Sequence, residues 1–258
     1  MGERTSYAPG TFSWVELSTT DPDAAKSFYT GLFGWEPEDN PIPGDGVYTT
    51  LNVRGKPAAA MYGQMEQERE AGIPPHWNSY VTVEDVDATA SRVSEAGGSL
   101  MAEPFDVMDV GRMAVVQDPT GAVFCLWEPR QHIGAGIVNE AGAFSWNELA
   151  TNDPDAAMRF YGELLGWKFN DFAEGYWVIM NGEASNGGVR RQSPQESGIP
   201  PNWIVYFTVE NVDDAVGAVE SAGGRTLAPA MELGPGRIAV VADPQGAAFA
   251  LFQGDVQD

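Results

Sequence analysis

The segment FSWVELSTTDPDAAKSFYTGLFGW, residues 12–35, returns almost unchanged as FSWNELATNDPDAAMRFYGELLGW at residues 144–167, with 16 of 24 positions identical. Two more blocks recur in the same order. GIPPHWNSYVTVEDVD begins at Gly72 and returns as GIPPNWIVYFTVENVD at Gly198, and GRMAVVQDPTGAVF begins at Gly111 and returns as GRIAVVADPQGAAF at Gly236. Repeats this long are typical of a duplicated domain, not of a solenoid. We therefore predict a first domain at 8–130, a linker at 131–143 and a second domain at 144–254.

Local patterns within one copy predict strands and helices in a regular order. Residues 13–19 alternate as a strand does, Asp21-Pro22 is a helix start, and Gly34 ends that helix. A second helix is expected from Asp85 to Gly97-Gly98. The further expected strands are residues 47–54, 57–63, 77–83, 99–103, 112–117 and 122–128. Each copy thus contains two units made of a strand, a helix and further strands, which predicts an α+β fold.

Composition limits the classes of partner. The 258 residues carry a formal net charge of −23, which repels nucleic acid phosphates and anionic lipid headgroups. Cys125 is the only cysteine, so no disulfide forms within the chain. The sequence shows no signal-peptide pattern and no run of about 18 apolar residues. We expect a cytoplasmic protein whose partner is a small molecule, with no nucleic acid or membrane partner, and the sequence leaves the oligomeric state open.

The motifs have a recognisable family order. Asp21-Pro22 through Phe28-Tyr29 and Gly34-Trp35, then Val83 through Asp87, then Asp118-Pro119-x-Gly121 resemble the vicinal oxygen chelate superfamily of glyoxalases, bleomycin-resistance proteins and dioxygenases. The layout is similar to two-domain glyoxalase-like proteins of actinobacteria, some of which carry the label of hydroxylase. The resemblance implies tandem glyoxalase-like domains with four βαβββ modules in total, two per domain. Each pair of modules would curve a sheet around a cleft.

In enzymes of that superfamily the cleft holds a divalent metal, usually through His, Glu or Gln from the first and last strands of each module. The resemblance places three such positions of the first copy on Trp14, Asn78 and Cys125. In the second copy the same positions fall on Trp146, Ile204 and Ala250. Tryptophan has only an N–H donor and cannot bind a metal. We therefore predict no metal and no cofactor, and we interpret the two histidines, His76 and His132, as surface or capping residues. A register slip would leave Glu16 and Glu148 as possible ligands.

Strand alternation predicts what lines each cleft instead. Aromatic side chains and one carboxylate per copy suit an aromatic or cationic organic ligand through stacking, cation–π contact and charged hydrogen bonds. The candidate ligand-binding residues are Trp14, Glu16, Asn78, Tyr80, Cys125, Trp127 and Arg112 in the first copy, and Trp146, Glu148, Tyr206 and Arg237 in the second. In the alternative interpretation the aromatic rings fill the barrel, and Arg112 or Arg237 on a neighbouring strand pairs with the glutamate. No catalytic residue can be assigned, and Cys125 is interpreted as a buried inert thiol.

Three functional hypotheses follow. The leading one is metal-independent binding or sequestration of a small, largely apolar or cationic organic molecule. The alternative is a metal-dependent glyoxalase- or dioxygenase-type enzyme whose atypical ligand shell includes Glu16 or Glu148. A third is an interaction protein whose clefts are filled by its own side chains.

Overall fold

The computed structural model describes residues 2–42, 46–234 and 236–254. The first copy contributes eight strands and three helices. They are β1 (Phe12–Thr19), α1 (Pro22–Phe33), β2 (Glu36–Ile42), β3 (Gly46–Val53), β4 (Lys56–Gly63), α2 (Glu66–Glu70), β5 (His76–Thr82), α3 (Val86–Ser91), β6 (Ser99–Val107), β7 (Gly111–Gln117) and β8 (Val123–Pro129).

The second copy repeats this order, with a short 3-10 helix in place of α2. Its elements are β9 (Phe144–Thr151), α4 (Pro154–Leu165), β10 (Lys168–Ala173), β11 (Tyr176–Asn181), β12 (Ala184–Arg191), η1 (Pro194–Glu196), β13 (Asn202–Thr208), α5 (Val212–Ser221), β14 (Arg225–Leu233), β15 (Gly236–Ala242) and β16 (Ala248–Gly254).

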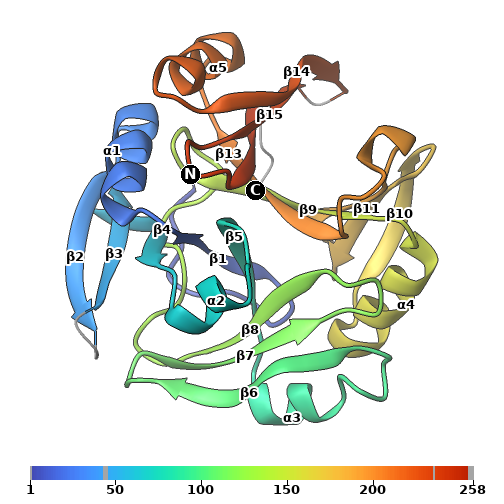
Figure 1. The fold of residues 1–258 in the computed structure, drawn as a ribbon. Coiled ribbons are helices and arrows are strands. Elements are labelled where there is room, and N and C mark those ends of the chain that lie inside the picture. Colours follow the sequence, from blue (N-terminus) through green and yellow to red (C-terminus); the bar gives the residue numbers. More distant parts are fainter. Residues whose placement is uncertain (1, 43–45, 235, 255–258) are drawn as a thin grey trace.

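Each copy forms one eight-stranded sheet. The first has the order β2-β3-β4-β1-β5-β8-β7-β6, and the second has the equivalent order β10-β11-β12-β9-β13-β16-β15-β14. The two modules of a copy meet where β1 pairs antiparallel with β5, and β9 with β13, so modules join within a copy. In Figure 1 the first sheet curls from β2 at the left to β6 at the bottom. The α+β fold predicted from the sequence is confirmed.

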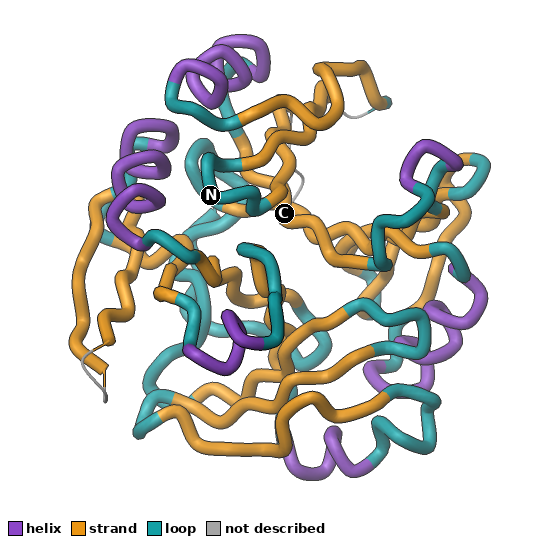
Figure 2. The backbone as a smooth tube through the Cα atoms, in the orientation of Figure 1, coloured by secondary structure: helices purple, strands orange, loops and turns teal. Residues whose placement is uncertain are grey.

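Helices lie mostly on the outside of the two sheets, while α2 lies within the curve of the first (Figure 2). The caps of α1 are those expected from the sequence: Asp21 accepts a hydrogen bond from the Ala24 N–H, and Gly34 takes the left-handed conformation with φ of 68°. Helix α3 is shorter than expected. The N–H groups of Arg92 and Val93 bond three residues back, to Thr89 and Ala90, which tightens the chain into turns before Gly97.

The repeated Phe-Tyr and Asp-Pro motifs join one copy to the other. The Tyr29 hydroxyl on α1 donates to Asp243 Oδ2 in the second copy at 3.0 Å, and it accepts from Trp77 Nε1 at 3.1 Å. The second copy returns the same link, from Tyr161 on α4 to Asp118 Oδ2 at 3.1 Å. Both tyrosines are fully buried. The hydrophobic clusters are correspondingly mixed, with residues of both copies in the two largest.

The carboxylate of Asp118, in the repeated Asp-Pro motif, forms hydrogen bonds within both copies. Its Oδ1 accepts the N–H groups of Thr120, Gly121 and Ala122, which closes the turn between β7 and β8. Its Oδ2 remains for Tyr161. One buried carboxylate therefore shapes a turn in its own copy and holds a helix of the other.

The predicted linker is packed against the first copy. Ala135 and Gly136 donate backbone hydrogen bonds to Ser13 and Pro57, and Ile137 forms an isolated bridge with Glu3. Gly134 has φ of +108°, and a Cβ atom there would collide with the Ser13 carbonyl oxygen, so this position requires glycine. These contacts hold residues 131–143 against the first copy, and we call this segment the strap. The exact domain boundaries stay a prediction.

Among the described helices, none combines the length and the apolar composition that crossing a membrane requires.

Candidate functional site

The inner face of the first sheet, on the side where α2 lies, gathers five of the residues singled out in the sequence. Trp14 and Glu16 alternate along β1, Tyr80 pairs with Trp14 from β5, and Cys125 and Trp127 come from β8, which runs parallel to β5. These side chains are 2–8% exposed. The rings and the carboxylate therefore pack on one another and fill this face.

Glu16 is held there by phenols. Tyr80 donates to Oε1 at 2.6 Å and Tyr48 donates to Oε2 at 2.9 Å, while the Tyr48 hydroxyl also accepts from Trp14 Nε1. Burial raises the pKa of Glu16, and the two phenol hydrogen bonds offset part of that rise. The sequence analysis did not include Tyr48 among the candidate site residues. Its position in the predicted strand 47–54 was the signal that could have indicated it.

Polar residues close the α2 end of this face. Glu68 on α2 accepts from Ser18 on β1 and from Tyr62 on β4, both at 3.1 Å. Asn78 lies beside them on β5 and its Oδ1 faces His76 Nε2 at 3.2 Å. Asn78 is thus a rim residue, not part of the aromatic wall.

His132 closes the other end, from the strap. Its ring meets Trp14 edge-on with centroids 4.5 Å apart and lies 5.9 Å from the Trp127 ring, while the His132 carbonyl accepts from Trp127 Nε1 at 2.9 Å. Burial lowers the pKa of His132 to about 4. The sequence analysis interpreted His132 as a surface or capping residue of the linker and did not predict its contact with the aromatic wall. The first inner face is therefore covered by the protein itself.

Cys125 is deeply buried, and burial raises the pKa of its thiol far above the usual range. A thiol that stays protonated is a poor nucleophile. Its neighbours are the aromatic wall and Glu16, which disfavours the thiolate further.

The inner face of the second sheet keeps the glutamate and changes its partner. Arg190 Nε donates to Glu148 Oε1 at 2.8 Å, and Tyr206 and Tyr176 also hydrogen-bond to this carboxylate. Burial raises the pKa of Glu148 while the Arg190 charge opposes the rise. The guanidinium is also bound in a fork by Glu196, whose pKa Arg190 lowers to about 2. Arg190 is the counterpart of Tyr62 in the first copy, because Arg190 pairs with β9 at the position in the register where Tyr62 pairs with β1.

The other side chains of the second inner face are more apolar than their counterparts in the first copy, and two of them are smaller. Ile204 replaces Asn78, Ala250 replaces Cys125, and Phe252 replaces Trp127. Ile204 and Ala250 form a separate hydrophobic cluster with Tyr206 and Ile238, and Trp146, Val240 and Phe252 pack against this cluster while remaining partly exposed. The second inner face thus offers an accessible apolar wall beside an ion pair whose carboxylate is buried and whose guanidinium is half-buried.

The expectation that Arg112 and Arg237 share this face with the glutamates is wrong. Arg112 is one step from Met113, which pairs with Trp127, so the two side chains lie on opposite faces of β7. Its guanidinium binds Asp87 and Asp106, at 2.6 and 3.0 Å. Arg237 likewise binds Asp213 and Glu232. These arginines fasten α3 and α5 to their sheets from outside.

The side chains at the metal positions of the family do not fit a divalent metal. Trp14, Asn78 and Cys125 offer one amide and one protonated thiol, and Trp146, Ile204 and Ala250 offer nothing. The oxygens of Glu16 and Glu148 already accept from tyrosine or arginine. Among residues 2–42, 46–234 and 236–254, no group of three His, Cys, Asp or Glu side chains could hold a metal ion.

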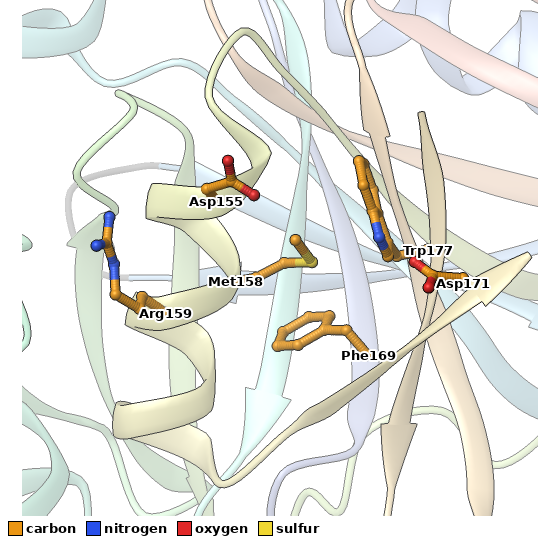
Figure 3. Close-up of a pocket in the computed structure, with 6 residues that line it drawn as sticks. All are labelled: Asp155, Met158, Arg159, Phe169, Asp171 and Trp177. Carbon is orange, nitrogen blue, oxygen red and sulfur yellow. The ribbon is translucent and has the colours of Figure 1, made fainter. Parts of the chain in front are cut away.

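Two cavities lie away from the inner faces. One, of about 510 Å³, lies between α4 and the β10–β11 hairpin (Figure 3). The other, of about 420 Å³, lies where α1 meets the start of α5.

Comparison with known proteins agrees with this architecture. The family model described as the glyoxalase/bleomycin resistance protein/dioxygenase superfamily matches residues 11–126 and 143–251. The chain is 43% identical over 259 residues to "Putative glyoxylase CFP32" of Mycobacterium tuberculosis, covering 98% of each chain. It is 34% identical over 265 residues to "Anthracycline biosynthesis protein DnrV" of Streptomyces peucetius, covering 96% of this chain and 95% of the relative. The Mn(II)-bound glyoxalase from Novosphingobium aromaticivorans superimposes with a TM-score of 0.65 over 100% of this chain and 84% of its own, at 16% identity, which shows the shared fold.

Proposed function

This chain belongs to the glyoxalase/bleomycin resistance protein/dioxygenase superfamily, and from that premise we propose that it binds a small, largely apolar aromatic molecule on the inner face of its second sheet, without a metal. The observation that carries the proposal is the contrast between the two inner faces. The first is covered by its own rings and by His132, whereas the second leaves Trp146, Val240 and Phe252 partly exposed beside a buried carboxylate that is paired with the half-buried Arg190.

The chemistry of that face favours a flat ligand with one polar edge. Trp146 and Phe252 supply partly exposed ring surfaces for stacking, and Val240 supplies aliphatic contact, while Ile204, Tyr206 and Ile238 form the buried cluster behind them. Arg190 binds Glu148 through Nε and Glu196 through both terminal nitrogens, which leaves one N–H on each terminal nitrogen to donate to a carbonyl or phenol oxygen at the edge of the ligand. The name of the Streptomyces peucetius relative refers to anthracycline biosynthesis. Anthracyclines are planar polycyclic molecules with polar edges, and we propose this class as the first to test.

Binding would be measured on chelator-treated protein by titrating an anthracycline and following its own fluorescence. We expect saturable binding of one molecule per chain in the absence of metal. Restoring binding only after Mn²⁺, Ni²⁺, Zn²⁺ or Fe²⁺ is added would refute the metal-independent proposal and support the enzyme alternative.

A matched pair of exchanges locates the site. Ile204→Asn gives the second face the residue of the first, and we expect it to weaken binding about tenfold, because it places an amide in the apolar cluster against which Trp146 and Phe252 pack. Asn78→Ile makes the reverse exchange on the covered first face and should leave binding unchanged. Equal effects from both exchanges would mean that the ligand does not bind the second inner face.

A further inference from the structure

The cavity between α4 and the β10–β11 hairpin has an equivalent place in the first copy, where an ion pair joins the helix to the hairpin. Lys26 on α1 places its ammonium against both carboxylate oxygens of Asp39, at 2.7 and 2.8 Å, and Thr49 donates to the same carboxylate at 2.7 Å. This Lys26–Asp39 contact lowers the pKa of Asp39. The first copy thus has a small ammonium site occupied by its own lysine.

The second copy retains the carboxylate and lacks the lysine. Alignment of residues 12–35 with 144–167 places Met158 where the first copy has Lys26. Strand pairing places Asp171 opposite Trp177 as it places Asp39 opposite Thr49, so the two aspartates are equivalent. The ammonium is gone and its carboxylate partner is still there.

Rings and a thioether surround the place where the ammonium would lie. Met158, Phe169 and Trp177 are half-buried and line the cavity with Asp171, and Asp155 contributes a second carboxylate. Figure 3 shows Met158 and Phe169 between the helix and the hairpin, with Trp177 and Asp171 on the hairpin side. Indole and phenyl faces attract a cation electrostatically, and the attraction adds to that of a nearby carboxylate. One lining residue, Arg159 on α4, opposes a cation, and Figure 3 shows its guanidinium on the far side of the helix from Trp177.

The second cavity shows the same exchange. In the first copy Arg92 donates to the Glu163 and Leu164 carbonyls at the end of α4, at 2.6 and 2.8 Å. In the second copy Ala218 stands at the position of Arg92, and the 420 Å³ cavity lies there. Both cavities therefore occur where a cationic side chain of the first copy has no equivalent in the second.

We propose that the cavity lined by Met158, Phe169, Asp171 and Trp177 is a binding site for an organic ammonium ion, a primary or quaternary amine with a short apolar body. The ligand cation takes the position that the Lys26 ammonium has in the first copy. The site is separate from the inner face of the second sheet, and either site can fail its test without the other.

The test uses n-butylammonium and tetramethylammonium chloride with ¹⁵N-labelled full-length protein. The protein has eight tryptophans, and a Trp177→Phe variant identifies the indole N–H signal of Trp177. We expect a saturable shift of that signal with a Kd of about 1–20 mM, as befits a single partly exposed cation site. The neutral analogue n-butanol should cause a shift at least fivefold smaller.

Variants then separate this site from general attraction to an acidic protein. Met158→Lys restores the internal ammonium and should weaken binding at least tenfold, while Met158→Leu should change it less than twofold. Asp171→Asn, at an exposed position that cannot disturb the core, should weaken binding at least fivefold. Arg159→Gln should strengthen it about twofold or more.

Lys26→Met in the first copy is the matched control. It removes the same ammonium from a place that has Pro37 and Thr49 instead of rings, so it should create no second site of similar affinity. The proposal is overturned by any of three results: no saturable shift up to 100 mM, unchanged binding in Met158→Lys and Asp171→Asn, or equal shifts with n-butanol.

Discussion

Removing the hydroxyl of Tyr29 should destabilise the whole molecule, because that hydroxyl joins the two copies. Tyr29→Phe leaves two buried groups without their partner: Trp77 Nε1, which donates to the hydroxyl, and Asp243 Oδ2, which accepts from it. A buried polar group that loses its partner costs about 1–3 kcal/mol. Two such groups, less the saving from no longer burying the hydroxyl, give a loss of about 2–4 kcal/mol in the free energy of unfolding.

The loss should also depend on pH. Burial raises the pKa of Asp243, and the Tyr29 hydrogen bond opposes that rise. Without the bond the folded-state pKa rises further above the unfolded value. A carboxyl whose folded-state pKa is raised makes the protein less stable as pH increases through that pKa, so the variant should lose more stability at pH 8 than at pH 5.

Urea denaturation followed by tryptophan fluorescence and by far-ultraviolet circular dichroism measures this loss. Tyr62→Phe is the control, because Tyr62 also donates to a carboxylate, Glu68, but on a half-buried rim within one copy. We expect a cost of under 1 kcal/mol there. Tyr161→Phe should resemble Tyr29→Phe. If Tyr29→Phe and Tyr62→Phe differ by less than about 0.5 kcal/mol, the reasoning about the link between copies is wrong.

Three other predictions concern the strap and the first inner face. Gly134→Ala should cost more than 2 kcal/mol in thermal or urea unfolding, since the backbone has φ of +108° and the new Cβ meets the Ser13 carbonyl oxygen; a neutral result would contradict the fixed strap. His132→Gln should reduce the free energy of unfolding that the protein loses when pH falls from 6.5 to 4. The pKa of His132 is about 4 in the folded state, so in this pH range mainly the unfolded state gains a proton, and glutamine removes that difference. Denaturation at pH 7 and at pH 4.5 measures the change. Glu16→Gln should gain stability relative to the natural protein as pH rises from 4 to 8, since the raised pKa makes ionised Glu16 costly; a difference that does not change with pH would refute this.

The sequence predicted the fold because the same patterns occur twice. Asp21, Gly34 and the Asp118 turn act through short-range hydrogen bonds, so their residue types indicate the local structure directly. Strand alternation also predicted that Trp14, Glu16 and Tyr80 lie on one face of the sheet. The β2 strand was not placed, since EPEDNPI has the polar composition of a loop and is ordered by pairing with β3.

Partners at long range could not be predicted. The sequence suggested Arg112 for Glu16, but a one-residue difference in register puts the arginine on the other face. The actual partners, Tyr48 and Tyr80, are 32 and 64 residues from Glu16. The contact of His132 with Trp14 depends on the path of the strap, which no local pattern encodes.

The reciprocal links from Tyr29 to Asp243 and from Tyr161 to Asp118 have the geometry of a twofold symmetric dimer interface, in which each half gives what it receives. Here both halves belong to one polypeptide, so each half is always present at a fixed ratio of one to one. In a dimer of identical subunits, a substitution on the inner face would appear twice. In the fused chain it appears once, and that allows one face to bind its glutamate through two tyrosines while the other pairs its glutamate with arginine.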